Sequence, residues 1–369
     1  MSDWLISNKD QRQLVPTLTK ALQGGEPHRW TDGTGDLDAL LERAATLGAF
    51  ALVVPEEAGG GSWSDQPVLD AALATAMLGT DLAPLPIPEL TAAAALLVAC
   101  PASAERDELL GNHAAGEELC LLPFRVEDEH GDQVLPTLTE GRLSAARAAF
   151  VQIPGAAHLL VPVTRAGQTL LARLGLDELL PSATEPTSLD LTRRIRQVDL
   201  TGVGVPDERL LPIAEQEVLR ATALGTALVC AEVVAGIDTL LRKAVEYSLT
   251  REAFGQVIAS FQALKHLLAD ARMELEGAKA VTVAAVEAFA AGDAWAAEAA
   301  SIAKAYVDER AVPLAMNCLQ VFGGIGFAWE HELHLYLRRA AARCGALGTR
   351  AEHLRVIDDL HISEWEAAR

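Results

Sequence analysis

The chain has 369 residues, half of them hydrophobic, and a formal net charge of −21. One hydrophobic core rarely covers this length, so two or three subdomains are expected, while the negative charge argues against nucleic acid or an anionic membrane surface as a partner. No uninterrupted apolar run has the length of a membrane span, and the start, Met1-Ser2-Asp3-Trp4, lacks the basic and apolar regions of a secretory signal. A cytoplasmic protein is therefore expected.

The cysteines favour a reducing compartment. They are odd in number, far apart and mostly in apolar surroundings, which indicates buried thiols in place of disulfides or a metal cluster. They are Cys100, Cys120, Cys230, Cys318 and Cys344.

The first segment, residues 1–115, is predicted to be a helical domain. Apolar residues recur at three- and four-residue spacing in 37–47 and again in 68–78. The glycine-rich stretch 53–62 between them either turns the chain or lets a ligand approach the backbone, and a turn is favoured.

Residues 116–212 are predicted to form a small antiparallel β domain. Short apolar runs alternate there with turn residues such as Glu140-Gly141 and Arg165-Ala166-Gly167. Pro136 and Pro162 interrupt two of the runs, and proline confines a strand to an edge or to its own end.

From residue 213 to 369 the helical period returns and persists. Alanine-rich seams indicate long helices that pack as a four-helix bundle. The expected helices cover 221–250, 258–291, 295–321 and 329–342. The predicted fold class is thus α+β and mainly α, with the order helices, sheet, helices.

Two motifs in this last region carry chemistry. The first motif places a guanidinium, a glycine turn and an amide between two long helices. It consists of Arg251-Glu252-Ala253-Phe254-Gly255, followed by Phe261-Gln262. The second motif combines another amide with glycine backbone that a ligand can approach closely. It is Gln320-Val321-Phe322-Gly323-Gly324-Ile325-Gly326. Together they predict a site for a large anionic cofactor.

These motifs resemble those of the acyl-CoA dehydrogenase flavoprotein family. Two further elements share the resemblance: Glu246-Tyr247 ahead of the first motif, and Val54-Pro55-Glu56-Glu57-x-Gly59-Gly60 near the N-terminus. The resemblance covers nearly the whole chain and is strongest in its last third. The run from Gly326 to Arg339 is similar to a bacterial subgroup that includes subunits of heteromeric dehydrogenases for sterol side chains.

The resemblance implies flavin adenine dinucleotide (FAD) as cofactor, an acyl-CoA as substrate and an electron-transfer flavoprotein as acceptor. It implies that Arg251 reaches across a subunit interface to the flavin nucleotide, where a planar cationic fork suits a pyrophosphate. The other implied cofactor-binding residues are Phe254, Phe261, Gln262, Gln320, Gly323 and Gly324. Two ordinary alternatives are an ion pair of Arg251 with Glu246 or Glu252 and a plain helix C-cap at the glycines.

The chain departs from the family at the position of the catalytic base and in the strands that face the flavin. The implied reaction is α,β-desaturation of an acyl-CoA, in which a glutamate removes the α-proton while the flavin accepts the β-hydride. Leu347 stands where this glutamate is expected before Gly348-Thr349, and the family's alternative position falls at about Thr226. The strands that should offer hydrogen bonds to the flavin read Leu121-Leu122-Pro123-Phe124-Arg125 and Ala149-Phe150-Val151-Gln152.

Three hypotheses remain open. The chain is one subunit of a heteromeric acyl-CoA dehydrogenase (a heterotetramer) whose partner carries the glutamate; or it is self-sufficient, as a homo-oligomer, and uses Glu232, Glu215 or Glu217 as a relocated base; or it is a non-catalytic scaffold. The subgroup resemblance suggests a steroid-like or otherwise bulky acyl group.

Two polar groups are set aside. His266 on a helix is interpreted as a core or interface histidine. Glu330, His331, Glu332 and His334 resemble metal ligands, yet they lack a third ligand at a suitable spacing, and no metal is predicted.

Overall fold

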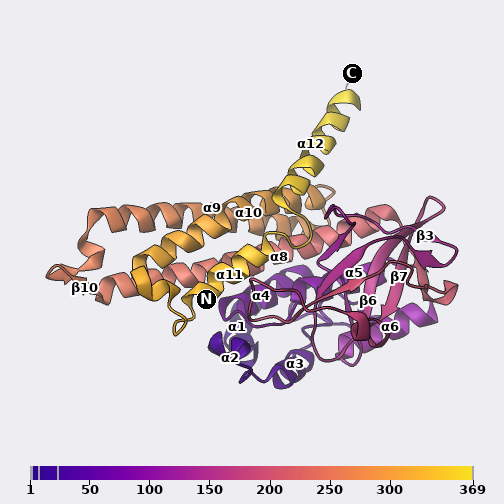
Figure 1. Ribbon diagram of the computed structural model, residues 1–369, viewed down its shortest axis with the longest axis horizontal. Coiled ribbons are helices and arrows are strands. Elements are labelled where there is room, and N and C mark those ends of the chain that lie inside the picture. The colour runs from indigo at the N-terminus through magenta and orange to yellow at the C-terminus, as the bar shows by residue number, and fades with distance from the viewer. Residues whose placement is uncertain (1–2, 7–8, 23–24, 368–369) are drawn as a thin grey trace.

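The computed structural model describes residues 3–6, 9–22 and 25–367. Met1 and Ser2, which belong to the start considered above as a possible secretory signal, lie outside the described residues. Helices come first, a β domain follows, and long helices complete the chain (Figure 1). This order confirms the predicted α+β, mainly helical fold.

The N-terminal helices cover one side of the long helices that follow later in the chain (Figure 1). The predicted helices at 37–47 and 68–78 are present as α3 and α4. In full, the elements are η1 (Asp3–Leu5), α1 (Lys9–Leu22), α2 (His28–Thr31), α3 (Leu37–Thr46), η2 (Glu56–Ala58), α4 (Pro67–Thr80), α5 (Ile87–Ala99) and α6 (Ala104–Ala115).

The middle segment forms two main sheets, in the orders β1-β6-β7-β9 and β2-β5-β8. The predicted turns are present: Glu140 and Gly141 join β3 to β4, and Ala166 and Gly167 join β6 to β7, all with positive φ. The elements are β1 (Leu119–Leu121), β2 (Arg125–Glu127), β3 (Leu138–Thr139), β4 (Arg142–Leu143), β5 (Arg147–Val151), β6 (Ala156–Arg165), β7 (Gln168–Gly175), α7 (Leu176–Leu179), η3 (Leu180–Ser182), β8 (Ile195–Asp199), η4 (Asp207–Arg209) and β9 (Leu210–Pro212).

Two expectations for this domain are wrong. It is not wholly antiparallel, because β1 pairs with β6 in parallel. Pro162 also lies within β6, an interior strand and not an edge. The proline is tolerated because β1 pairs with β6 only as far as Leu159, so Pro162 faces only Leu171 of β7 across the ladder.

The last segment supplies the long helices. They end within one residue of the predicted bounds, but α8 starts six residues earlier than predicted, and α9 and α11 each start four residues later. The elements are α8 (Glu215–Thr250), β10 (Glu252–Ala253), β11 (Gln256–Val257), η5 (Ile258–Ser260), α9 (Gln262–Ala291), α10 (Ala296–Phe322), η6 (Gly323–Phe327), α11 (Leu333–Arg343) and α12 (Arg350–Ala367).

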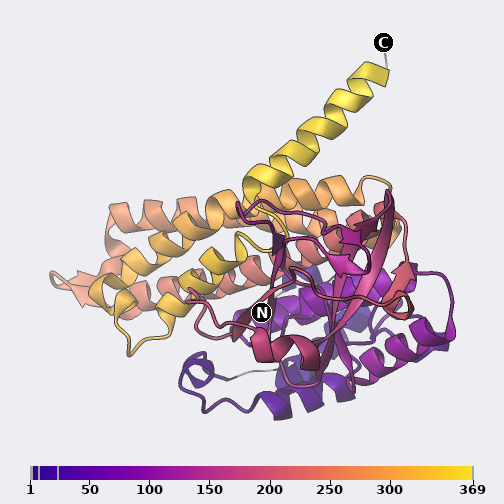
Figure 2. The same ribbon diagram turned by 45° about the vertical axis from the view of Figure 1, so that its right-hand side comes forward.

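Helix α12 was not predicted. It projects away from the body of the molecule (Figure 2). Its apolar side chains Leu354, Val356, Leu360 and Ile362 are 37 to 55% exposed, and their spacing forms no single stripe directed at the core. Hydrophobic periodicity therefore gives no signal for it.

Helix α8 runs through the middle of the structure and packs against α4, α5, α9 and α10. By length and composition it is the single described helix that could cross a membrane, yet its most apolar window is entirely buried. Such burial is typical of the core helix of a globular domain.

Helices α4 and α8 touch backbone to backbone. A Cβ added at Gly79 would lie 2.6 Å from the carbonyl oxygen of Glu232. We expect Gly79→Ala to lower the free energy of unfolding by about 1–3 kcal/mol, because the helices must separate to admit the methyl group. Urea unfolding of the purified variant measures this change.

The matched control is Gly111→Ala in α6, where the nearest atom to the new methyl group, the Ala58 carbonyl oxygen, is 3.8 Å away. Alanine favours a helix over glycine, so this variant should gain up to about 1 kcal/mol. Equal effects of the two substitutions would show that the α4–α8 contact does not matter.

Candidate functional site

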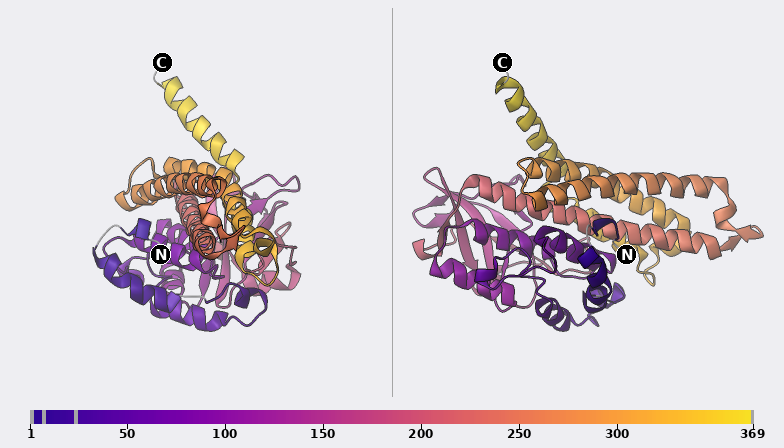
Figure 3. Two further views of the ribbon diagram at one scale, coloured as in Figure 1. Left: turned by 90° about the vertical axis from the view of Figure 1, so that its left-hand side faces the viewer. Right: turned by 180° about the vertical axis from the view of Figure 1, so that it is seen from behind.

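The two sequence motifs meet at one end of the helical bundle. Helix α8 ends there, the β10–β11 hairpin protrudes beyond it, α9 begins and α10 ends (Figure 3). The rings of Tyr247 in α8 and Phe322 in α10 lie 4.7 Å apart, which joins the two helix ends. We call this region the bundle tip, residues 247–262 and 320–327.

Arg251 lies at the C-terminal cap of α8 and is exposed. Its backbone N–H donates to the Tyr247 carbonyl oxygen at 2.9 Å, and its own carbonyl accepts from the Ile258 N–H at 2.8 Å. Within the described part of the chain its guanidinium forms no ion pair, so the alternative pairing with Glu246 or Glu252 is absent. The guanidinium is available to a ligand.

Phe254 occupies the hairpin turn with Gly255, and both have positive φ. Its side chain is 96% exposed and meets the ring of Phe261 edge to face, with centroids 6.3 Å apart. Gln262 is the exposed first residue of α9. The exposed ring of Phe254 and the half-buried ring of Phe261 thus form a small aromatic surface at the bundle tip.

The second motif leaves backbone accessible. Helix α10 ends at Phe322, and Gly323 adopts φ 61° and ψ −139°, a conformation that suits glycine. Apart from the adjoining residues of the chain, no described atom lies within 4 Å of where a Cβ would stand at Gly323 or Gly324, and Gln320 is exposed beside them. A guanidinium, two amides and bare backbone fit the acceptor-rich diphosphate and adenine of a dinucleotide.

The bundle tip and the β domain lie at opposite ends of the long helices (Figures 1 and 3). The structure thus brings the predicted cofactor residues together but holds them apart from Leu347 and from the strands expected to face the flavin.

Leu347 fills the position of the expected base. It is 4% exposed with φ 55°, and its N–H donates to the Phe124 carbonyl oxygen at 2.8 Å. Its Cδ1 lies 2.9 Å from where a Cβ of Gly225 would stand, and the Cβ of Ala92 is 3.0 Å from the same point. Leu347 therefore packs between α5 and α8, and it also lines cavities of about 210 and 490 Å³.

Thr226, at the alternative base position, is 1% exposed, and its hydroxyl donates to the Thr222 carbonyl oxygen at 3.0 Å. Neither position offers a carboxylate.

A histidine holds the turn around Leu347. The Nε2 of His353 is 3.1 Å from the Leu347 carbonyl oxygen, and its Nδ1 is 3.2 Å from the Ser301 hydroxyl. Burial lowers the pKa of His353 to about 4, so the ring is neutral at neutral pH. A neutral ring can donate to the carbonyl and accept from the hydroxyl at once.

Six buried charged residues lie next to this turn, and we call them the buried ion cluster. Arg339 bonds Glu232 at 2.6 Å and Asp190 at 2.5 Å. Arg343 bonds Glu89 at 2.5 Å and Glu232 at 3.0 Å, while Arg193 bonds Glu232 at 2.9 Å. Sequence reasoning missed this cluster, although two arginines four residues apart on α11 were a visible signal.

These contacts make Glu232 an unsuitable base. Burial alone would raise its pKa, but the charges of Arg193, Arg343 and Arg339 outweigh burial and lower the pKa to about 2. A carboxylate held this way is a poor proton acceptor near neutral pH.

The other two candidate bases lie at the start of α8. Glu215 is exposed and lines a cavity of about 210 Å³ between α8 and the β domain. Glu217 is half-buried.

The remaining polar groups have ordinary environments. His266 is exposed on α9, so it is not a core histidine. Glu332 pairs with Lys243 at 2.5 Å, and His334 stacks on Trp329. The five cysteines are free thiols, and the residues that the structure describes contain no group suited to hold a metal ion.

The N-terminal signature forms a turn. Glu56–Ala58 is a short 3-10 helix capped by Gly59 at φ 85°. A Cβ at Gly60 would collide with the Val54 carbonyl oxygen, so the glycine permits close folding of the chain on itself. This agrees with the favoured interpretation of a turn.

Comparisons with known proteins place this geometry in a family. The family model described as "Acyl-CoA dehydrogenase, C-terminal domain" matches residues 218–359. Acyl-CoA dehydrogenase FadE34 of Mycobacterium tuberculosis is 33% identical over 333 residues, and the match spans 88% of this chain but 43% of FadE34. Acyl-CoA dehydrogenase IpdE2 of the same organism is 30% identical over 324 residues, with 87% of this chain and 85% of IpdE2 covered.

Solved structures share the fold at lower identity. The ChsE4-ChsE5 complex of M. tuberculosis has a chain that matches with a TM-score of 0.80 at 22% identity, covering 96% of this chain and 98% of that one. Butyryl-CoA dehydrogenase of Megasphaera elsdenii matches with a TM-score of 0.81 at 20% identity, covering 97% and 99%. With the IpdE2 match extending over most of both sequences, the chain belongs to the acyl-CoA dehydrogenase family.

Proposed function

We propose that this chain is the flavin-sharing subunit of a heteromeric, FAD-dependent acyl-CoA dehydrogenase. It lends Arg251, Gln320 and Gly324 to a flavin bound mainly by a partner subunit, and the partner supplies the catalytic glutamate. One contrast carries the proposal: Leu347 is buried and packed where the base is expected, while the nucleotide-binding groups at the bundle tip are exposed.

The flavin, when bound, supplies the hydride acceptor for desaturation of the acyl group. This chain's residues would bind and orient it: Arg251 would donate to the diphosphate, Gln320 would offer its amide to the adenosine end, and Gly323-Gly324 would let backbone approach. Phe254, Phe261 and Gln262 are the neighbouring residues at the bundle tip that would contact the cofactor.

The relatives support a shared site and a bulky substrate. One solved structure is described as a complex of two chains, ChsE4 and ChsE5, and another as a steroid acyl-CoA dehydrogenase, Tcur3481-Tcur3483. More than half of FadE34 lies outside the match, which leaves length for a second chain of this size. A steroid-like acyl-CoA as substrate and an electron-transfer flavoprotein as acceptor complete the proposal, and the cytoplasm is the proposed compartment.

Co-expression tests the proposal. The chain is purified alone and together with an acyl-CoA dehydrogenase homologue that has the glutamate before Gly-Thr. We expect the chain alone to lack turnover, and the pair to co-purify with flavin and to reduce a dye with a steroid acyl-CoA. If the chain alone is yellow and fully active, and the second subunit leaves its rate unchanged, a homo-oligomeric enzyme with its own base replaces the proposal.

Restoring the carboxylate should not restore the reaction in the isolated chain. In Leu347→Glu a carboxylate would replace a buried apolar side chain between α5 and α8 at the edge of two cavities. We expect a loss of roughly 3 kcal/mol of stability, and no turnover because the partner that binds most of the flavin is absent. Leu219→Glu, at a side chain that is 62% exposed, should change stability by less than about 0.5 kcal/mol. Turnover by isolated Leu347→Glu would show that this chain binds flavin and substrate without a partner subunit, which would contradict the proposal.

A further inference from the structure

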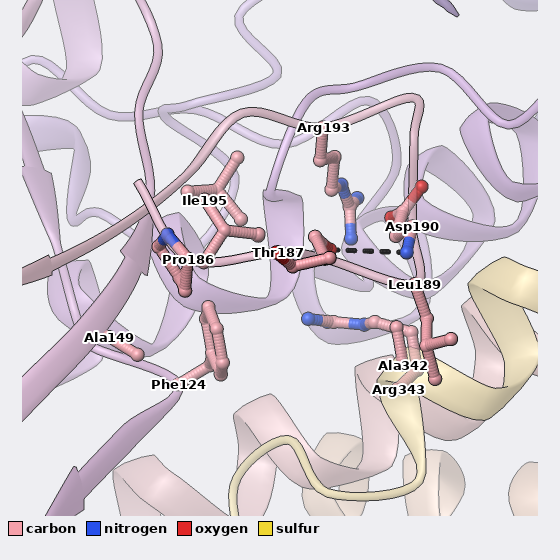
Figure 4. Close-up of a pocket in the computed structure, with 12 residues that line it drawn as sticks. Phe124, Ala149, Pro186, Thr187, Leu189, Asp190, Arg193, Ile195, Ala342 and Arg343 are labelled. Carbon is pink, nitrogen blue, oxygen red and sulfur yellow. Dashed lines mark hydrogen bonds between the residues drawn. The ribbon is translucent and has the colours of Figure 1, made fainter. Parts of the chain in front are cut away.

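The protein fixes its arginine side chains in two ways. Arg193 and Arg343 of the buried ion cluster point from separate elements toward one cavity (Figure 4). Carboxylates hold both of them: Arg193 bonds Glu232 at 2.9 Å, and Arg343 bonds Glu89 at 2.5 Å. Arg251 forms no ion pair within the described part of the chain, so the backbone of the bundle tip sets where its guanidinium can reach.

The backbone on both sides of Arg251 is hydrogen-bonded. Its N–H donates to the Tyr247 carbonyl oxygen at 2.9 Å, which forms the last turn of α8. Its carbonyl oxygen accepts from the Ile258 N–H at 2.8 Å, which closes the base of the β10–β11 hairpin. Arg251 therefore keeps a fixed place relative to the turn of α8 that carries Tyr247.

The second motif is fixed to the end of α10 in the same manner. Gln320 lies in the last turn of this helix, and its carbonyl oxygen accepts from the Gly323 N–H at the C-cap. A Cβ added at Gly326 would lie 2.8 Å from the Leu319 carbonyl oxygen, so η6 folds closely onto the helix end. Gln320 and Gly323 therefore keep a fixed place relative to Phe322, the last residue of α10.

The rings of Tyr247 and Phe322 join these two helix ends. Their centroids lie 4.7 Å apart and their planes are tilted by 32°. Tyr247 is half-buried and Phe322 is buried, so much of the contact is shielded from water. Aromatic rings at this separation attract each other beyond the effect of the area they bury. The ring pair is thus a direct tie between the turn that carries Arg251 and the turn that carries Gln320.

A dinucleotide contacts both motifs at once only if the distance between Arg251 and Gln320 matches the ligand. Holding the two groups at that distance before binding removes an ordering cost, and affinity rises accordingly. We propose that Tyr247 and Phe322 are positioning residues for the flavin nucleotide: their ring contact sets the distance between Arg251 and Gln320. The inference rests on the proposed function, because it concerns the same shared site.

The test measures the FAD affinity of the assembled complex, with the glutamate-bearing partner unchanged. Tyr247→Leu and Phe322→Leu each remove one ring and keep an apolar side chain. Each should weaken FAD binding by roughly three- to tenfold, since side chains in contact are commonly coupled to this extent. Tyr247→Phe keeps the ring and should restore the affinity of the unchanged chain. Gel filtration checks that every complex assembles.

A double variant shows whether the ring acts through the arginine. The distance between two groups matters only while both contact the ligand. Arg251→Ala/Tyr247→Leu should therefore bind FAD about as weakly as Arg251→Ala alone, so that the two losses are not additive. Losses that add in full would show that Tyr247 does not act through Arg251, and would overturn the proposal.

Tyr306→Leu is the matched control, because Tyr306 is a half-buried tyrosine of α10 far from the bundle tip. It should bind FAD as the unchanged chain does. Equal weakening in this control would assign the loss to general loosening of the bundle and overturn the proposal. Failure of both ring variants to assemble would make the pair purely structural and would also overturn it.

The outcomes separate this inference from the function on which it rests. Full FAD affinity in Tyr247→Leu and Phe322→Leu, beside a weakened Arg251→Ala, overturns the positioning role and leaves the shared flavin site standing. Full affinity in Arg251→Ala overturns the shared site, and the positioning role with it.

Discussion

Glu232→Gln is expected to destabilise the protein by about 3–5 kcal/mol, the loss typical of breaking a buried ion pair from one side. The carboxylate contacts Arg193, Arg339 and Arg343 inside the core. Glutamine is nearly isosteric but uncharged, so three buried guanidinium groups would face two remaining carboxylates. Denaturant unfolding of the variant measures the loss.

Glu287→Gln on the exposed face of α9 is the matched control and should stay within about 0.5 kcal/mol of the unchanged chain. A Glu232→Gln variant that is fully stable but has lost turnover in the assembled enzyme would contradict this account. Such a result would make Glu232 a base after all.

The same carboxylate predicts a dependence of stability on pH. Its pKa in the folded state, about 2, lies below the ordinary value of 4.5, so the folded state binds fewer protons than the unfolded one. Its contribution, roughly 3 kcal/mol, is complete above pH 4.5 and is lost as pH falls toward 2. The difference in Tm between the unchanged chain and Glu232→Gln should therefore shrink from pH 6 to pH 3.

Much of the fold could be predicted because long helices repeat their apolar residues at a constant period. Helices α8, α9 and α10 show this, since their buried faces are continuous over many turns. Helix α12 could not be predicted, because an exposed helix needs no apolar stripe. The parallel pairing of β1 with β6 depends on residues far apart in sequence, which local patterns do not report.

The bundle tip and the buried ion cluster also differ in how far local sequence patterns predict them. The groups at the bundle tip follow local motifs, so the sequence predicted that Arg251 and Gln320 would serve one ligand. The buried ion cluster joins Glu89, Asp190, Glu232 and Arg343 from four separate segments, so the spacing of the two arginines on α11 could not by itself identify their partners. Glu232 was therefore considered as a base from its apolar helix alone, without the arginines that fix its charge.

Replacing Arg251 with alanine is expected to weaken FAD binding strongly. Its guanidinium is exposed at the bundle tip and has no ion pair in the part of the chain that the structure describes, so its removal should leave the fold intact. A charge-assisted hydrogen bond to a diphosphate is worth about 1.5–3 kcal/mol, which corresponds to a tenfold to hundredfold loss of FAD affinity. Arg251→Lys keeps the charge but lacks the planar guanidinium. Its FAD affinity should therefore lie between that of the unchanged chain and that of Arg251→Ala.

The decisive measurement is the FAD content of the assembled complex of this chain with its glutamate-bearing partner, made with Arg251→Ala in this chain alone. Absorbance of released flavin, divided by the amount of complex from gel filtration, gives the occupancy at a fixed FAD concentration. Arg12→Ala, an exposed arginine in α1, is the control. The account predicts an intact complex with FAD affinity at least tenfold weaker in Arg251→Ala and unchanged in Arg12→Ala; full flavin occupancy and affinity in Arg251→Ala would contradict it.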